Sequence, residues 1–294
     1  MVFPAASPVA RELVVAQALQ QRRFIKRRYA WVAHQPGIFL KIPRVSNQVE
    51  RDAASANVRT MAKQEFDELS ILAGLAEPVI RPIALVERYA CLALPQVHGQ
   101  ELRAHLLRHP KAERSQTALF EALGVLATIH TASLQKPPPI LPGDPAQRAA
   151  CALPSPADRK SITIEGFEIR NFLLEDRTDK VWFYDPHFLT IGYPEDDVMR
   201  FIISLLMLNW SRSLHCMAWV SFPYSQLLAH YQERAGRTLC PQALRRCFQS
   251  TRKLRFENAS RSIAAMPPFV RPAARFYQAV YFAQIDAWAV RHDL

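Results

Sequence analysis

The stretch IEGFEIRNFLLEDRTDKVWFYDPH, residues 164–187, decides the fold of this chain. It contains two short apolar runs, residues 172–174 and residues 181–184, which are separated by a polar turn. Two β-prone runs joined in this way predict a β-hairpin. Asn171 directly precedes the first strand and Asp185 directly follows the second. We therefore expect these side chains to lie close together, where an amide oxygen and a carboxylate suit Mg²⁺ held against a phosphate.

This hairpin resembles the catalytic loop and the metal-binding loop of the protein-kinase-like superfamily, in the branch of aminoglycoside phosphotransferases and lipopolysaccharide sugar kinases. In that family an Asn and an Asp hold the metal ions, and a catalytic Asp precedes the Asn in the loop. The resemblance implies that Asn171 and Asp185 bind Mg²⁺ and that ATP is the phosphate donor. Gly166 occupies the position of the catalytic Asp. The base would then be Glu165 beside it or Glu168 inside the loop.

The residues before the hairpin follow the order expected for the smaller lobe of such a protein. The apolar run IFLKI, residues 38–42, resembles the strand whose Lys grips the α- and β-phosphates of ATP, which implies this role for Lys41. Residues 50–75 predict a helix with apolar positions at helical spacing. The resemblance implies that Glu68 on this helix pairs with Lys41, and Glu65 one turn earlier is the alternative.

A second part of the nucleotide site is expected where the two lobes join. The apolar run at residues 90–94 predicts a strand, and the Gly turn and helix start after it resemble the hinge between the lobes. Adenine would then bond to backbone groups near Gln96 and Val97, and Leu94 would line the pocket. No GxGxxG motif precedes the Lys strand, where only Gly37 is available. Backbone amides that cradle phosphates are therefore not expected in that loop.

The rest of the chain predicts mainly helices. Residues 115–130 resemble the central helix of the larger lobe, and acidic residues open a helix at residues 198–210. The resemblance implies that Asp197, or alternatively Asp196, braces the catalytic loop. Three more helices are predicted at about residues 223–235, 241–264 and 270–290. The apolar side chains expected to be core in the last region are Phe269, Phe276, Tyr277, Val280, Phe282, Ile285 and Trp288.

The expected fold class is α+β: a two-lobed protein-kinase-like fold with a small antiparallel-sheet N-lobe and a mostly helical C-lobe. Residues 1–20 would form an N-terminal extension, residues 21–95 the N-lobe with its αC-like helix, and residues 96–294 the C-lobe that carries the hairpin. A hydrophobic content of 49% over 294 residues is sufficient for a sizeable core. A proline-rich connection from Thr131 to about Ala157 would carry a substrate contact or be mobile.

The charge of the chain favours anionic partners. The formal net charge is +11, which suits phosphates, acidic lipid head groups or nucleic acid. Residues 21–31 mix basic and aromatic side chains, which indicates either contact with an anionic surface or, more commonly, an edge strand with solvated Arg side chains. A nucleic-acid partner is not expected, because the chain has no recognisable motif for one. The helix at 241–264 could face an anionic substrate, a membrane or solvent with its cations, which are Arg245, Arg246, Arg252, Lys253, Arg255 and Arg261.

The cysteines and the N-terminus favour a cytoplasmic protein. The 5 Cys are scattered, odd in number and without CxxC spacing, which fits a reducing compartment and neither a disulfide framework nor a zinc site. Arg11 and Glu12 interrupt the first twenty residues where a signal peptide would need an apolar core. We expect a cytoplasmic location with peripheral contact to the inner membrane surface.

Three functions remain open from the sequence. The first is an ATP- and Mg²⁺-dependent phosphotransferase that acts on a sugar or glycolipid hydroxyl of the lipopolysaccharide type, the acceptor class that the resemblance implies. The second is a catalytically dead pseudokinase that acts as a scaffold or regulator, because Gly166 replaces the catalytic Asp. The third is an unrelated basic protein that binds nucleic acid.

Overall fold

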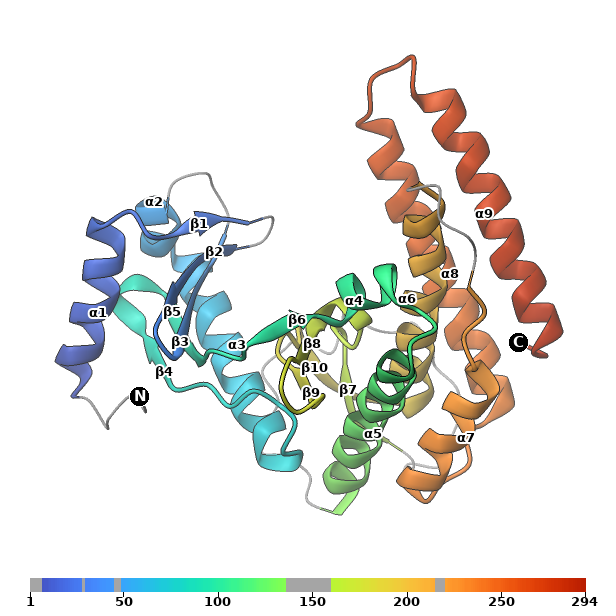
Figure 1. Ribbon diagram of the computed structural model, residues 1–294, viewed down its shortest axis with the longest axis horizontal. Helices are drawn as coiled ribbons and strands as arrows, with labels where there is room; N and C mark the ends of the chain where they lie inside the picture. Colours follow the sequence, from blue (N-terminus) through green and yellow to red (C-terminus); the bar gives the residue numbers. More distant parts are fainter. Residues whose placement is uncertain (1–6, 28–29, 45–48, 136–159, 215–219) are drawn as a thin grey trace.

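The computed structural model describes residues 7–27, 30–44, 49–135, 160–214 and 220–294, and it has two lobes (Figure 1). The smaller lobe contains a sheet and the N-terminal helices, and the larger lobe is mainly helical. Most of the proline-rich connection lies outside the described residues. This arrangement confirms the expected α+β fold class.

The smaller lobe is built on a five-stranded antiparallel sheet with the strand order β1-β2-β3-β5-β4. In β3, Leu40 and Ile42 are buried, whereas Lys41 between them points to the other side of the strand, because side chains alternate along a strand. Val32 of β2 lies opposite Lys41 in the ladder. The strands are β1 (Ile25–Lys26), β2 (Ala30–Gln35), β3 (Ile38–Pro43), β4 (Ala84–Val86) and β5 (Cys91–Pro95).

Helices pack against this sheet. α1 (Pro8–Gln20) buries Val15 and Ala18, so the residues expected to form an extension belong to the core of the smaller lobe. The helix expected at residues 50–75 is two helices, α2 (Val49–Ala54) and α3 (Ala56–Leu75). The apolar residues of α3 face the core because they recur at helical spacing, and they are Val58, Ala62, Leu69 and Leu72.

The helices of the larger lobe agree closely with those predicted from the sequence. α5 is long and apolar enough to cross a membrane by length and composition, but most of it is buried inside the protein. The helices are α4 (Leu102–Arg108), α5 (Glu113–Gln135), α6 (Pro194–Leu214), α7 (Tyr224–Ala235), α8 (Pro241–Ala264) and α9 (Arg271–Arg291).

The core prediction for the C-terminal region was partly wrong. Phe282, Ile285 and Trp288 are buried, as expected. The other four residues, Phe269, Phe276, Tyr277 and Val280, are exposed. Phe269 is 84% and Phe276 71% accessible to solvent. α9 has apolar residues on two faces, and periodicity alone does not tell which face the rest of the protein covers.

The predicted hairpin is present. β8 (Phe172–Glu175) pairs with β9 (Val181–Phe183), with Phe172 opposite Phe183, and β6 (Gly99–Glu101) adds a third strand beside β8. A second small sheet pairs β7 (Ser161–Ile164) with β10 (Leu189–Gly192).

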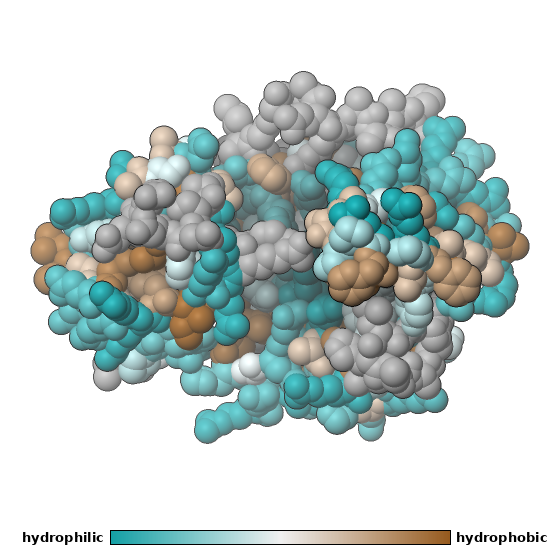
Figure 2. Space-filling model, turned by 90° about the horizontal axis from the view of Figure 1, so that it is seen from above, coloured by the Kyte–Doolittle hydropathy of each residue, from teal (hydrophilic) through white to brown (hydrophobic). Residues whose placement is uncertain are grey.

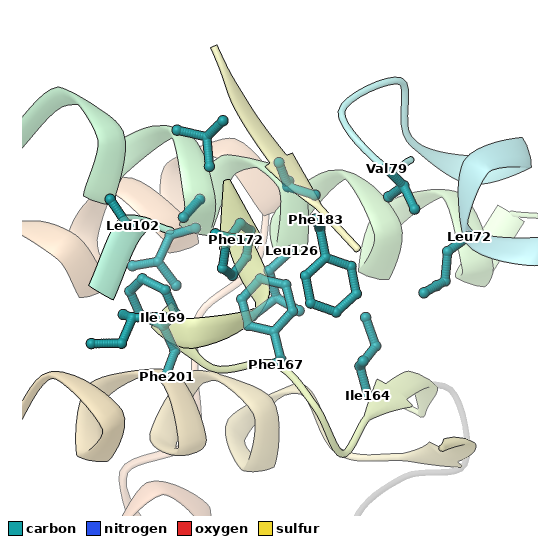
Figure 3. Close-up of a cluster of buried hydrophobic side chains, with 14 of the residues drawn as sticks. Leu72, Val79, Leu102, Leu126, Ile164, Phe167, Ile169, Phe172, Phe183 and Phe201 are labelled. Atoms are coloured by element: carbon teal, nitrogen blue, oxygen red, sulfur yellow. The ribbon is translucent and has the colours of Figure 1, made fainter. Parts of the chain in front are cut away.

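Phenylalanines pack beneath the hairpin (Figure 3). The ring of Phe167 lies 5.1 Å from that of Phe172 and 5.3 Å from that of Phe183, and Phe201 of α6 closes the cluster. All four side chains are fully buried. Aromatic pairs at such distances are worth about 0.5–1.5 kcal/mol each beyond their buried area. The cluster therefore fixes the open end of the hairpin against the rest of the larger lobe.

Backbone hydrogen bonds between the segment after α3 and β9 also join the two lobes. The segment after α3 runs beside β9: Ile80 N–H donates to Phe183 O at 2.9 Å, and Phe183 N–H donates to Pro78 O at 2.9 Å. Val79 and Phe183 form a parallel β-bridge. The C-terminal end of α3 is thus attached to the hairpin of the larger lobe.

Candidate functional site

Lys41 lies at the centre of a charge network that three distant segments form. Its Nζ atom is 2.6 Å from Oε1 of Glu65 on α3 and 3.2 Å from Oδ1 of Asp185 after β9. Only 13% of the Lys41 side chain is exposed. Strand alternation turns Lys41 toward α3, and the hairpin delivers Asp185 from the larger lobe. The network therefore bridges the two lobes.

The electrostatics keep Lys41 and Asp185 charged. Burial opposes the charge on Lys41, but the carboxylates of Asp185 and Glu65 outweigh this effect and raise the pKa of Lys41 above its ordinary value. Burial would raise the pKa of Asp185, but the positive charges of Lys41 and His187 outweigh it and lower that pKa. At neutral pH the site thus presents a fixed ammonium group beside a carboxylate, an arrangement that suits polyphosphate bound with a cation.

The prediction that Glu68 pairs with Lys41 was wrong, and the alternative, Glu65, is the partner. The Glu68 carboxylate is fully buried and accepts hydrogen bonds from Nε2 of Gln64 at 2.9 Å and from the backbone N–H of Leu189 at 3.2 Å. The two glutamates are three residues apart on one side of α3, about 4.5 Å along its axis. The position of α3 along β3 determines which glutamate reaches Lys41, and the spacing of residues in the sequence does not reveal that position. Glu68 instead joins α3 to the larger lobe.

The expected proximity of Asn171 and Asp185 is confirmed. Nδ2 of Asn171 donates to the backbone oxygens of Gly166 at 2.7 Å and of Asp185 at 3.0 Å. These two bonds identify which end of the amide is nitrogen, so the Oδ1 oxygen is directed away from both carbonyl groups. Asn171 is 3% exposed.

The donor set fits a divalent cation that is shared with a phosphate. An amide oxygen from Asn171 and the carboxylate of Asp185 are hard oxygen ligands, which Mg²⁺ and Ca²⁺ prefer. Among the described residues, no group of three or more His, Cys, Asp and Glu side chains is placed to hold a metal ion. A cation here would therefore take further oxygens from phosphate or water, which is the usual state of Mg²⁺ at nucleotide sites.

Gly166, at the position expected for a catalytic Asp, has no room for a side chain. A Cβ atom built there would lie 2.3 Å from the backbone oxygen of Asp185 and 2.7 Å from that of Pro186. The backbone N–H of Gly166 donates to the same Pro186 oxygen at 2.8 Å. The loop and the segment after the hairpin thus approach each other closely, and the space is filled by backbone carbonyl groups.

The two candidate bases differ in their surroundings. Glu168 is 7% exposed, and its carboxylate forms ion pairs with Arg255 of α8 and, at 3.0 Å, with Nε of Arg170. Both of its oxygens are therefore engaged within the protein. Glu165 is partly exposed. Burial alone would lower the pKa of Arg200, but the negative charges of Asp196 and Asp197, with a smaller effect from Glu165, raise it. Of the two, Glu165 is the more exposed to solvent.

The segment expected to bind adenine is tied to the turn between β2 and β3. The backbone N–H of Gln96 donates to Gly37 O at 3.1 Å, and Gly37 N–H donates to Oε1 of Gln96 at 3.2 Å. Leu94 is buried in β5 and Val97 is half-buried. Because the Gln96 N–H already has a partner, an adenine base would bond to the other backbone groups of this segment.

A buried chain of hydrogen bonds anchors the start of the loop between β7 and the hairpin. Both oxygens of Asp197 accept from the backbone N–H of Ile164, at 3.0 and 2.8 Å, and Oδ2 lies 3.1 Å from Nε2 of His130. Nδ1 of His130 lies 2.6 Å from the hydroxyl of Tyr231. Asp196, the alternative for this role, pairs instead with Arg200 on the surface of α6. The roles of His130 and Tyr231 had no signal in the sequence, because 101 residues separate them.

His130 gives the stability of the protein a dependence on pH. Burial, assisted by Arg237, lowers the pKa of His130 from 6.5 to about 3. Between these values the unfolded chain binds one more proton, so the free energy of unfolding falls by about 1.4 kcal/mol for each unit that the pH decreases below 6.5. Urea unfolding between pH 4 and pH 8 should show this slope. His130→Asn should lose it, and His34→Asn, at an exposed histidine, should keep it. An unchanged slope in His130→Asn would contradict the assignment.

The overall fold is shared with solved structures, although no family model and no curated protein matches the chain in sequence. Amicoumacin kinase, solved in complex with AMP-PNP, Ca²⁺ and Ami, superposes with a TM-score of 0.59 at 11% identity, over 97% of this chain and 96% of that one. The chain has a protein-kinase-like fold. The solved structures that share this fold include aminoglycoside phosphotransferases and related kinases.

Two further matches show the breadth of the similarity. The GDP complex of a mutant of aminoglycoside 2'-phosphotransferase IIIa has a TM-score of 0.56 at 8% identity, over 96% of this chain and 99% of that one. A choline/ethanolamine kinase family protein from Mesorhizobium loti has a TM-score of 0.51 at 12% identity, over 90% of this chain and 87% of that one. At these identities the matches establish the fold, and activity has to be argued from the site itself.

Proposed function

We propose that this protein is an ATP- and Mg²⁺-dependent phosphotransferase that acts on a hydroxyl group of a sugar or glycolipid. The observation that carries the proposal is the network of Lys41 with Glu65 and Asp185, which crosses the two lobes beside the Asn171 amide. Phosphoryl transfer needs positioning and charge neutralisation more than covalent chemistry from the protein. A lysine, a carboxylate and an amide in this arrangement supply both.

Each residue has a defined part. Lys41 would hold the phosphates, and Glu65 would keep its ammonium group in place. Asn171 and Asp185 would hold the cation, which supplies charge neutralisation between the terminal phosphates when it is bound. Glu165 is the candidate base for the acceptor hydroxyl, since the carboxylate of Glu168 is paired with two arginines. A base contributes about 10²–10⁴-fold to such rates.

The proposed acceptor class is based on the net charge of the chain and on the small molecules bound in solved structures of this fold. Solved structures of this fold contain small-molecule antibiotics, with streptomycin bound to one of them. The net charge of +11 favours an acceptor with anionic groups, such as a phosphorylated glycolipid. Such an acceptor would bring the protein to the cytoplasmic surface of the inner membrane.

A nucleotide-binding scaffold without transfer activity is the second candidate function. The observation that favours it is Gly166, where backbone carbonyl groups fill the space that a catalytic side chain would need. The two functions share the nucleotide and the cation but differ in whether the γ-phosphate is transferred.

Nucleotide binding is tested by thermal shift with AMP-PNP and Mg²⁺. At a ligand concentration of 100 times Kd, binding stabilises the folded protein by about 2.7 kcal/mol, or roughly 5–10 °C. Lys41→Met and Asp185→Asn should abolish the shift, whereas Lys63→Met, at an exposed lysine of α3, should retain it. If the wild-type protein shows no shift, both candidate functions fail.

Transfer is tested separately, with γ-labelled ATP and lipopolysaccharide or its sugar fragments as acceptors. Glu165→Gln should reduce transfer by about 10²–10⁴-fold and leave the AMP-PNP shift unchanged. Nucleotide binding without transfer to any acceptor would support the scaffold.

A further inference from the structure

α9 carries an apolar stripe on the face that the described part of the protein leaves exposed. The positions 273, 276, 280, 283, 287 and 290 are all apolar and all exposed. Among them Phe276 is 71%, Val280 43% and Val290 79% accessible to solvent. The opposite face of the helix packs into the larger lobe through Tyr281 and Phe282, among other residues. The stripe is therefore additional to the apolar face that the fold requires.

The position of α9 leaves this face open. α9 forms the outer edge of the larger lobe, and no labelled element lies beyond it in Figure 1. Seen from above, hydrophobic side chains lie on the surface in this part of the molecule (Figure 2). Contiguous exposed apolar surface of this kind marks an interaction site in soluble proteins.

The spacing of the stripe identifies the kind of partner. Its six positions alternate steps of three and four residues, which is the heptad pattern of helices that pack side by side along their length. A membrane-binding helix typically carries Lys and Arg along the border of its apolar face, whereas positions 277, 279, 284 and 286 beside the centre of this stripe are Tyr, Ala, Gln and Asp. The pattern thus indicates another helix as the partner.

Two copies of the stripe have complementary side-chain sizes when the helices run antiparallel. An antiparallel pair centred between Val280 and Ala283 places Ala273 against Val290, Phe276 against Ala287 and Val280 against Ala283. Every layer then combines one alanine with one larger side chain, which fills space evenly. A parallel pair would place Phe276 against its own copy and leave three layers of alanine against alanine.

We propose that α9 is the interface of a symmetric dimer in which two copies of this chain pack their α9 helices antiparallel.

The flanking positions do not oppose this arrangement. Residues 277, 279, 284 and 286 border the central part of the stripe, and Asp286 is the only charged residue among them. Asp286 is already paired with Arg252 of its own chain, through two hydrogen bonds of 2.9 and 2.7 Å. The interface is isologous, as is usual for homodimers.

The size of the stripe sets the expected affinity. α9 has 21 residues, so the stripe is at most about 32 Å long. One helix pair is smaller than a standard interface of about 1,200–2,000 Å². We therefore expect a dimer with a dissociation constant in the micromolar range.

The experiment is sedimentation equilibrium of the full chain at about 1–200 µM, where mass action resolves a dimer of this affinity. The wild-type protein should dimerise. Val280→Lys and Ala283→Glu, each at an exposed position, should weaken the dimer by at least about 30-fold, because each buries a charge at the centre of an apolar interface. Leu13→Glu is the control, at an apolar residue of α1 in the smaller lobe that is 60% exposed, and it should leave dimerisation unchanged.

Mixing the two charged variants tests the direction of the helices. In the antiparallel register the introduced Lys and Glu of the two chains face each other, so the mixture should form a heterodimer. In a parallel register they do not meet, and the mixture should stay monomeric. A mixture that stays monomeric would overturn the antiparallel arrangement.

A monomeric wild-type protein at 200 µM would overturn the proposal as a whole. Co-sedimentation with vesicles of about 30% phosphatidylglycerol in phosphatidylcholine then tests the other occupant of this face. Binding of the monomer that Ala283→Glu abolishes would assign the stripe to a membrane surface instead. All of these measurements are independent of nucleotide, so they neither require nor test the proposed activity.

Discussion

Gly166→Ala is expected to lower the free energy of unfolding by about 3 kcal/mol and the unfolding temperature by roughly 6–10 °C. The new Cβ atom would lie 2.3 Å from the backbone oxygen of Asp185, far inside contact distance. Backbone cannot give way as a flexible side chain can, and the hydrogen bond from Gly166 N–H to Pro186 O would have to shift as well. Gly166→Asp should be worse, because it adds a buried charge. Thermal unfolding followed by circular dichroism measures both effects.

The matched control is another glycine to alanine change. Gly74 lies in α3, and a Cβ atom there would meet nothing within 4 Å. Gly74→Ala should therefore leave stability unchanged or raise it by about 0.5–1 kcal/mol, the usual gain inside a helix. A Gly166→Asp variant that unfolds at the wild-type temperature and transfers phosphate faster would show that the loop accommodates a catalytic side chain after all.

Asp197→Ala is expected to destabilise the protein by about 3–5 kcal/mol, or roughly 10 °C. The Asp197 carboxylate is fully buried, and its removal leaves the N–H of Ile164 and the ring of His130 without the acceptor that they share. Ile164 begins the loop that leads to Asn171. We therefore also expect the nucleotide-dependent thermal shift to weaken in any of the variant protein that remains folded.

The neighbouring residue provides the comparison. Asp196 also precedes the apolar part of α6, but its pair with Arg200 is partly exposed at the surface of the helix. Such pairs contribute about 0.3–0.5 kcal/mol, so Asp196→Ala should lower the unfolding temperature by about 2 °C at most. Equal losses in the two variants would contradict the role assigned to Asp197.

Much of the fold could be predicted from local patterns. The hairpin at 164–187 was recognisable because two apolar runs flank a polar turn, and β8 and β9 lie at those runs. The helices α7 and α8 begin and end within a residue of their predicted bounds. These features depend on spacing along the chain, which a single sequence displays directly.

The features that could not be predicted depend on how distant elements meet. Glu65 and Glu68 lie on the same side of α3, one turn apart. Only the position of α3 against β3 shows which of them reaches Lys41. Gly166 marked a missing side chain in the sequence, but the carbonyl groups that fill its space come from residues that are distant in the chain. The exposed face of α9 was mistaken for core for the same reason, since no pattern tells which of two apolar faces is covered.

The attachment of α3 has a consequence for how this protein could be switched. A helix that swings away from its sheet would break the pair between Lys41 and Glu65. Here the buried Glu68 holds α3 to Leu189, and the segment after α3 is hydrogen-bonded to Phe183. The C-terminal end of α3 is thus attached to the larger lobe, while its apolar face packs in the core of the smaller lobe. An inhibitor designed to push α3 outward would have to break these attachments as well as the pair between Lys41 and Glu65.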